Sequence, residues 1–129
     1  MFVQKKNSRV KINLKKKKNM ILNYGSYGFK ILKPVELNEK HIEIMINIIK
    51  KLTNKKAKIK TTLVFNKIKT KKPDQIRMGK GKGNISEKVS QLIPGRIFLE
   101  MNNISKKQAL ICISKIQKKF HVCIKLITL

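Results

Sequence analysis

Hydrophobic residues at helical spacing mark two segments of this chain of 129 residues. In the first, at 38–52, apolar residues recur at intervals of three and four, which gathers them on one helical face. Those residues are Ile42, Met45, Ile46, Ile49 and Leu52, with Asn38 at the N-cap position. Ser105 and Gln108 form a capping-box pattern before the second segment. Its apolar face comprises Ala109, Cys112, Ile113, Ile116 and Phe120. The spacing predicts two amphipathic helices.

Alternation with a period of two predicts strands around these helices. The predicted strands fall within 23–32, 58–66, 89–93 and 96–101, with a last one around Val122, Ile124 and Leu126. Pro34 ends the first strand, and Pro94-Gly95 supplies a turn between the third and the fourth. The predicted class is α+β, a small and mostly antiparallel sheet packed against two helices as an α/β sandwich.

Two cation-rich stretches fall outside this pattern of elements. Residues 1–20 form a basic N-terminal extension, and residues 67–84 form a long basic loop inside a single domain at 21–129. Within the loop, glycines alternate with lysines from Gly79 to Gly83, which disfavours helix and strand because glycine loses the most backbone entropy on ordering. Loops this long in a compact domain are usually functional or disordered. The extension is either a solvated tail or an arm that orders on a polyanion, and its charge favours the arm.

The net charge points to a polyanionic partner. The chain has 32 Lys and Arg against 6 Asp and Glu, a formal net charge of +26. Such a chain repels itself and binds polyanions, and RNA is the polyanion that we expect. Only Arg9, Arg77 and Arg96 are arginine, and lysine suits phosphates better than bidentate base reading. The abundance of lysine, isoleucine and asparagine also fits an A/T-rich genome, either of an organelle or of a bacterium, which accounts equally well for the scarcity of arginine.

Motifs for other chemistries are missing from the sequence. No window has the spacing of a Walker A loop, and Asn84 stands where a dinucleotide fingerprint needs its third glycine. His41 is most simply a solvated helix residue, and neither it nor His121 has a second ligand at metal spacing. We therefore expect no enzyme activity, no cofactor and no metal site. No apolar run reaches the length of a membrane span.

The cysteines and aromatic residues allow two readings each. Cys112 and Cys123 are most simply small buried hydrophobes in a reducing compartment, although a disulfide between them stays open. Tyr24, Tyr27 and Phe29 alternate with glycines, which is compatible with a platform for base stacking and equally with core packing against the first helix.

Two motifs carry a family resemblance. The run Arg77-Met78-Gly79-Lys80-Gly81-Lys82-Gly83, followed by Pro94-Gly95-Arg96-Ile97-Phe98-Leu99-Glu100-Met101, resembles the signature of the family of large-subunit ribosomal protein sixteen, in bacterial numbering. The segment Tyr24–Phe29 and the order of elements over about 22–127 are also similar to that family. Glu87 and Lys88 depart from it, because the family commonly has an aromatic pair before the position of Val89.

The resemblance implies a non-enzymatic α+β protein that binds large-subunit rRNA near the peptidyl-transferase centre and helps to position tRNA at the A site. It implies rRNA, A-site tRNA and neighbouring ribosomal proteins as partners, without homo-oligomerisation. The expected RNA contacts are Lys5, Lys6, Arg9, Lys11, Lys15, Lys16, Lys17, Lys18, Lys71, Lys72, Arg77, Met78, Gly79, Lys80, Gly81, Lys82, Gly83 and Arg96. A free RNA-binding translation or ribosome-assembly factor is the alternative. Sequence drift and codon bias favour the mitochondrial ribosome and an organelle-encoded chain, with a plastid or an A/T-rich bacterial cytoplasm as alternatives.

Overall fold

The computed structural model describes residues 21–65, 67–79 and 81–129. The predictions for residues 1–20 and for Lys80 therefore lie outside the described residues. The elements are β1 (Tyr27–Ile31), β2 (Val35–Asn38), α1 (Glu39–Leu52), β3 (Lys58–Thr61), β4 (Lys67–Lys71), β5 (Asn84–Leu92), β6 (Ile97–Asn102), α2 (Lys106–Phe120) and β7 (Ile124–Thr128).

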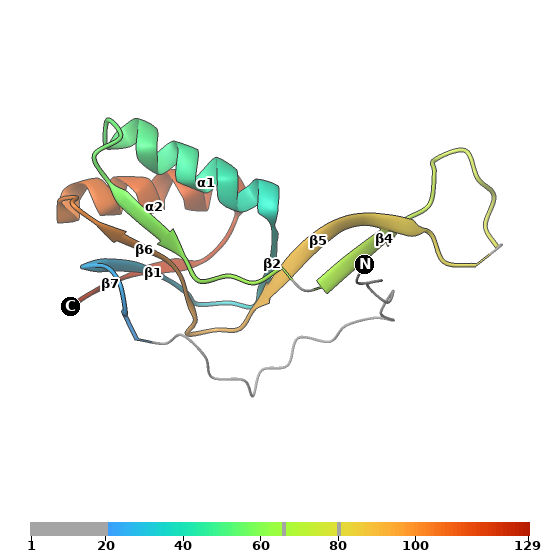
Figure 1. Ribbon diagram of the computed structural model, residues 1–129, viewed down its shortest axis with the longest axis horizontal. Helices are drawn as coiled ribbons and strands as arrows, with labels where there is room; N and C mark the ends of the chain where they lie inside the picture. The colour runs from blue at the N-terminus through green and yellow to red at the C-terminus, as the bar shows by residue number, and fades with distance from the viewer. Residues whose placement is uncertain (1–20, 66, 80) are drawn as a thin grey trace, which may run out of the picture.

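The described strands form two antiparallel sheets. One sheet has the order β3-β6-β1-β7 and the other the order β2-β5-β4. Figure 1 shows α1 and α2 together over one face of the four-stranded sheet, while β4 and β5 project sideways from it. The predicted α+β class is confirmed. The expectation of one sheet is wrong, because β2 and β4 add a second sheet that sequence alternation did not reveal.

The two helices begin where their capping residues predicted. Asn38 caps α1, and its side-chain oxygen accepts from the backbone N–H of His41 at 2.8 Å. His41 completes the box, since its Nδ1 accepts from the Asn38 N–H at 3.4 Å, and its ring meets Phe120 at 5.5 Å. The interpretation of His41 as a simply solvated residue is therefore wrong. Ser105 and Gln108 form the predicted capping box of α2.

The core lies between the helices and the four-stranded sheet. Phe29 and Ile31 of β1 and Leu99 of β6 are fully buried against Met45 and Ile49 of α1 and against α2. The apolar faces predicted for both helices supply this core, although Ile46, Leu52 and Phe120 are only partly buried. Burial of each such side chain contributes about 1.5–3 kcal/mol, so this region supplies most of the hydrophobic stabilisation in the described part of the chain.

Strand boundaries differ from the predictions where tertiary pairing decides them. β3 ends at Thr61, so the predicted strand at 58–66 is wrong over residues 62–65. β5 begins at Asn84 instead of Val89, because its first half pairs with β4. The Pro94-Gly95 turn is confirmed, and Gly95 adopts a positive φ of 89° there.

Both cysteines are free thiols. Cys112 is fully buried on α2, and burial raises the pKa of its thiol above the ordinary value. Cys123 is half-buried beside β7. Cys112 thus behaves as the small buried hydrophobe that the sequence predicts.

Candidate nucleic-acid interface

The long basic segment folds as a hairpin that projects from the protein. β4 and β5 pair from Lys67↔Val89 to Lys71↔Asn84, with an irregularity between Lys69 and Thr70. The predicted loop at 67–84 is therefore wrong at its two ends, and the true loop spans 72–83. β4 was not predicted because Lys67, Lys69 and Lys71 leave it without an alternating apolar face. Its pairing with β5 stabilises it instead, since cross-strand pairs can stabilise a polar strand. Figure 1 shows the loop far from both helices.

Gly83 closes the hairpin. A Cβ added there would lie 2.6 Å from the backbone carbon and 2.7 Å from the oxygen of Lys71, closer than side-chain carbons ever pack. Gly79 and Gly81 differ, because each adopts a positive φ and a Cβ would meet nothing within 4 Å. One glycine thus permits the close approach of the two strands, and the other two permit the turn of the loop in open space.

Short contacts shape the loop from within. The Lys72 ammonium donates to the carbonyl of Gly79 across the loop. Lys71 pairs with Asp74 at 3.3 Å, and the N–H of Ile76 donates to the Pro73 carbonyl at 3.2 Å. The exposed Lys71–Asp74 pair contributes little to stability. These contacts bend the segment into a loop whose outer residues point to solvent.

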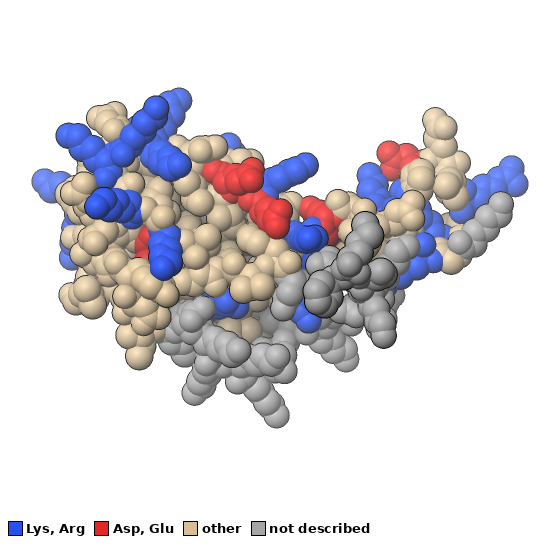
Figure 2. All heavy atoms as spheres, viewed as in Figure 1, with Lys and Arg blue, Asp and Glu red and all other residues tan. Residues whose placement is uncertain are grey.

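The end of the loop presents cations and apolar atoms to solvent. Arg77 and Lys82 are exposed, and Met78 is 101% exposed. In Figure 2, Lys and Arg side chains run along the projecting hairpin toward its end, and the acidic side chains of this face lie mainly between the hairpin and the body. The structure therefore brings Lys71, Lys72, Arg77, Met78, Gly79, Gly81, Lys82 and Gly83 together in one projection, as the sequence predicts.

Polar side chains secure the base of the hairpin. Glu36 on β2 pairs with Lys69 on β4 at 2.8 Å and accepts from Gln91 on β5 at 2.9 Å. The hydrogen bond from Lys69 lowers the pKa of Glu36, and the same bond raises the pKa of Lys69. These interactions join all three strands of the second sheet.

Glu87 explains one departure from the family pattern. Its carboxylate accepts from the Asn38 side chain at 2.6 Å, so it links β5 to the residue that caps α1. A polar residue here is therefore compatible with the fold, and the buried Val89 two residues later supplies the apolar contact.

Arg96 lies apart from the loop, at the turn between β5 and β6. Its guanidinium donates to the Thr62 carbonyl at 3.4 Å, and its buried Nε has no hydrogen-bond partner among the described residues. Burial lowers the pKa of Arg96, which nevertheless stays protonated at neutral pH. The structure thus does not join Arg96 to the cations of the hairpin loop.

Glu100 is a functional candidate that the sequence did not reveal. It is 2% exposed on β6, and its carboxylate accepts from the backbone N–H groups of Asn23, Tyr24 and Gly25 at 2.6–3.3 Å. Three backbone donors satisfy the buried charge. The alternation of β6 carried no sign of this role, because the three donors lie about 75 residues earlier in the chain.

Two of the three aromatic residues divide between the roles open to them, while Tyr27 is half-buried at the start of β1. Phe29 is buried and packs against Phe98 with ring centroids 6.3 Å apart. Tyr24 is 55% exposed, with the ammonium of Lys60 only 3.3 Å from its ring centroid. Core packing thus accounts for Phe29, whereas Tyr24 belongs to the surface.

Other kinds of site find little support in the described part of the chain. No group of three or more His, Cys, Asp and Glu side chains gathers there. Neither α1 nor α2 has the length and apolarity that crossing a membrane requires.

Sequence comparisons identify the family of this chain. The profile of the family described as ribosomal protein L16p/L10e matches residues 3–127. Large ribosomal subunit protein uL16 of Carsonella ruddii (strain PV) is 36% identical over 111 residues, which cover 83% of this chain and 82% of that protein. The uL16 of Buchnera aphidicola subsp. Cinara cedri (strain Cc) is 34% identical over 87 residues, covering 67% and 64%. That of Neorickettsia sennetsu (strain ATCC VR-367 / Miyayama) is 27% identical over 106 residues, covering 82% and 76%.

These matches confirm the resemblance carried by the glycine-lysine motif and the turn that follows β5. The matched region includes both helices, both sheets and the projecting hairpin. The chain therefore belongs to the ribosomal protein L16p/L10e family, whose members are structural constituents of the large ribosomal subunit and not enzymes.

Proposed function

We propose that this chain binds large-subunit rRNA near the peptidyl-transferase centre and that its hairpin loop helps to position tRNA at the A site. The observation that carries the proposal is the exposed cationic loop at 72–83, held away from the hydrophobic core by β4 and β5. Phosphate contacts of this kind supply affinity and register without reading bases. The proposal rests on family membership for its place in the ribosome.

The proposed roles of the loop residues differ with their chemistry. Arg77 and Lys82 contact phosphates, with Lys80 between them in the sequence. Gly79 and Gly81 let the RNA backbone approach, because nothing lies within 4 Å of the position of a Cβ. Lys72 mainly supports the loop through its bond to Gly79.

The remaining proposed contacts flank the hairpin. Arg96 contacts RNA through the accessible part of its guanidinium and is a weaker contact than Arg77, since Thr62 and burial already constrain it. The cations of the N-terminal extension, which the structure does not describe, contact rRNA as an arm. They are Lys5, Lys6, Arg9, Lys11, Lys15, Lys16, Lys17 and Lys18.

Assembled ribosomes provide the test. In the full chain, the triple substitution Arg77→Ala, Lys80→Ala and Lys82→Ala is expected to permit assembly and to slow accommodation of A-site tRNA. The matched control replaces three exposed lysines of α2, Lys106, Lys107 and Lys115, which also removes three charges. Accommodation at the wild-type rate in the loop variant, with normal occupancy of the subunit, would contradict the role at the A site.

Sedimentation in high salt separates a structural constituent from the alternative of a free translation or assembly factor. A constituent buried within the large subunit stays with it after the salt wash, whereas a factor bound at the surface mainly by screened charges dissociates. Loss of this chain from washed subunits would favour the factor.

We also propose the mitochondrial ribosome as the site of action. The support is the bias toward lysine, isoleucine and asparagine, together with divergence from the bacterial relatives, which are 27–36% identical. Fractionation of the source cells tests it, because the chain must then sediment with mitochondrial ribosomes. Recovery in plastid or bacterial ribosomes would overturn the assignment of compartment and leave the RNA-binding proposal intact.

A further inference from the structure

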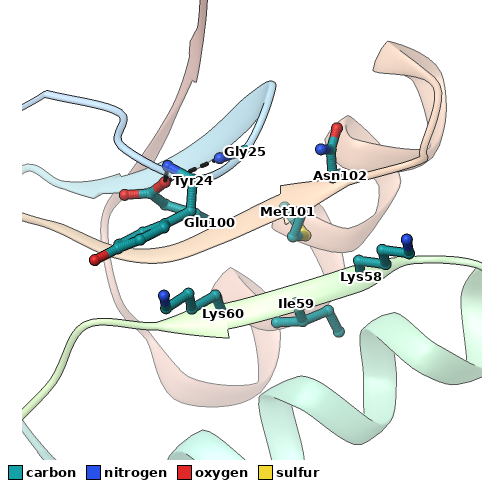
Figure 3. Close-up of a pocket in the computed structure, with 8 residues that line it drawn as sticks. All are labelled: Tyr24, Gly25, Lys58, Ile59, Lys60, Glu100, Met101 and Asn102. Carbon is teal, nitrogen blue, oxygen red and sulfur yellow. Dashed lines mark hydrogen bonds between the residues drawn. The ribbon is translucent and has the colours of Figure 1, made fainter.

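A pocket of about 290 Å³ lies at the edge of the four-stranded sheet, apart from the hairpin. Its lining comes from the segment before β1, from β3 and from β6 (Figure 3). The residues that matter for its chemistry are Tyr24, Lys58, Lys60, Glu100 and Asn102. Nothing in the proposed hairpin contact uses them.

Two lysines give the pocket its accessible charge. Lys58 and Lys60 alternate along β3 with Ile59, which packs against the core, so both ammonium groups stand on the side of the strand away from α1. Both lysines are exposed. Lysines on an edge strand also discourage pairing with a second chain, but that effect involves neither Tyr24 nor the pocket.

The acid of the pocket does not oppose an anionic ligand strongly. Glu100 is buried, and its carboxylate is turned toward the backbone donors of residues 23–25. Figure 3 shows the carboxylate directed at the backbone beside Tyr24 and away from the lysines. The same bonds hold the backbone of Tyr24 in place, with an N–H to Oε2 distance of 2.6 Å.

The aromatic ring of the pocket is held at the surface. Tyr24 keeps 55% exposure although the Lys60 ammonium lies 3.3 Å from its ring centroid. Gly25 lets the segment lie directly on β6, because a Cβ would meet the Met101 oxygen at 2.5 Å. The close contact of Gly25 with β6 and the hydrogen bonds of Glu100 thus fix the backbone around Tyr24, whose ring lies in the same pocket as Lys58 and Lys60.

We propose that this pocket is a second RNA contact, which takes an unpaired nucleotide with its base stacked on Tyr24 and its phosphates against Lys58 and Lys60. The Lys60 ammonium lies over one face of the Tyr24 ring, so the base stacks on the face that Lys60 does not cover, with its phosphate beside the lysines. An exposed aromatic ring next to cations is the combination that proteins use for single-stranded RNA. Asn102, which is exposed, also lines the pocket, and its side-chain oxygen accepts from the Ser26 hydroxyl at 2.9 Å. This contact rests on the proposed RNA-binding function and adds to it a site specific for unpaired nucleotides.

Tyrosine emission tests the stacking directly. The chain has two tyrosines and no tryptophan, so in the full-length Tyr27→Phe variant the emission comes from Tyr24 alone. Saturation with an oligouridylate of about 12 nucleotides, a length within the usual range of site sizes, is expected to quench that emission. A duplex of the same length is expected to leave it unchanged. Unchanged emission with saturating single strand would overturn the proposal, as would equal quenching by the duplex.

Affinities then separate this contact from that of the hairpin. Tyr24→Leu is expected to weaken binding of the single strand by about 10-fold, while Tyr24→Phe keeps the wild-type affinity because the ring remains. Lys60→Gln weakens it more than Lys51→Gln, a control on the exposed end of α1. Tyr24→Leu binding as tightly as wild type would refute the stacking.

The outcomes distinguish failure of this inference from failure of the proposed function. If the pocket is wrong and the hairpin right, the Arg77, Lys80 and Lys82 variant loses RNA affinity whereas Tyr24→Leu does not. If the pocket binds RNA and the hairpin does not, Tyr24→Leu loses RNA affinity whereas the Arg77, Lys80 and Lys82 variant keeps it. If Lys60→Gln, the loop variant and Lys51→Gln all lower RNA affinity to the same extent per charge removed, the binding is non-specific. That result would overturn the proposed pocket.

Discussion

The helix-covered sheet and the projecting hairpin obey different physical rules. In the sheet, large apolar residues such as Phe29, Phe98 and Met45 are fully buried between layers. In the hairpin loop, Ile76 and Met78 are 53% and 101% exposed, and lysines outnumber apolar residues. The hydrophobic effect holds the first region together, whereas backbone pairing, close-packed glycine and a few polar bonds hold the second. Substitutions should therefore damage stability in one region and RNA contact in the other.

The largest expected effect is a loss of core packing. Phe29→Ala should lower the free energy of unfolding by about 3–5 kcal/mol, because it removes a buried ring and leaves a cavity. Met78→Ala, in the exposed loop, should change it by less than about 0.5 kcal/mol. Urea unfolding of the two full-length variants compares them. If both variants lose the same free energy of unfolding, Met78 must pack against other residues in the free protein. The contrast between a packed core and an exposed loop would then be wrong.

A smaller effect should come from the glycine that closes the hairpin. Gly83→Asn should destabilise by about 1–3 kcal/mol, because its Cβ collides with the Lys71 backbone and the strands must part. The same change at Gly81 is the control, since the site is open and asparagine tolerates positive φ. Hydrogen exchange of the β4 and β5 amides should rise in the first variant and not in the second. Matching exchange rates would show that closure does not depend on Gly83.

The smallest effect concerns the pairing of Glu36 and Lys69 at the base of the hairpin. The lowered pKa of Glu36 contributes stability that is present above the pKa of unfolded glutamate, about 4.3, and is lost as the pH falls through the lower folded value. The raised pKa of Lys69 contributes stability that is present below the unfolded lysine pKa, about 10.4, and is lost as the pH rises through the higher folded value. Because both side chains are partly exposed, each effect should stay below about 1 kcal/mol.

Thermal unfolding against pH measures this contribution. Glu36→Gln should lose less stability than wild type as the pH falls below about 4.3, because residue 36 no longer titrates. Asp74→Asn, which alters an exposed pair, is the control. If the melting temperature of Glu36→Gln falls with decreasing pH as steeply as that of wild type, the acid dependence comes from other carboxylates.

Elements with strong local signals could be predicted from the amino-acid sequence alone. Apolar spacing indicated the helices, and Asn38 and Ser105 marked where they begin, since caps act within one turn. The glycine-lysine run indicated a cationic projection, because no regular element accommodates that pattern. β4 escaped prediction, as its lysines alternate without an apolar face and depend on β5 for stability.

The surface pocket was beyond prediction for a related reason. Tyr24, Lys60 and Glu100 are distant in sequence and meet only because β6 lies between β1 and β3. The interpretation of His41 failed partly for this reason, since Phe120 comes from the other helix, whereas its capping partner Asn38 lies only three residues away.

The amino-acid sequence by itself determined the α+β class, both amphipathic helices with their caps, the great excess of positive charge and the conformationally permissive glycines of the loop. These properties depend on composition and on neighbours within a few residues. Only the tertiary structure decided that the strands form two sheets, that Gly83 closes a hairpin and that Glu100 secures the segment around Tyr24. Those features depend on backbone pairing and buried charge between residues far apart in the chain, for which local patterns carry no signal.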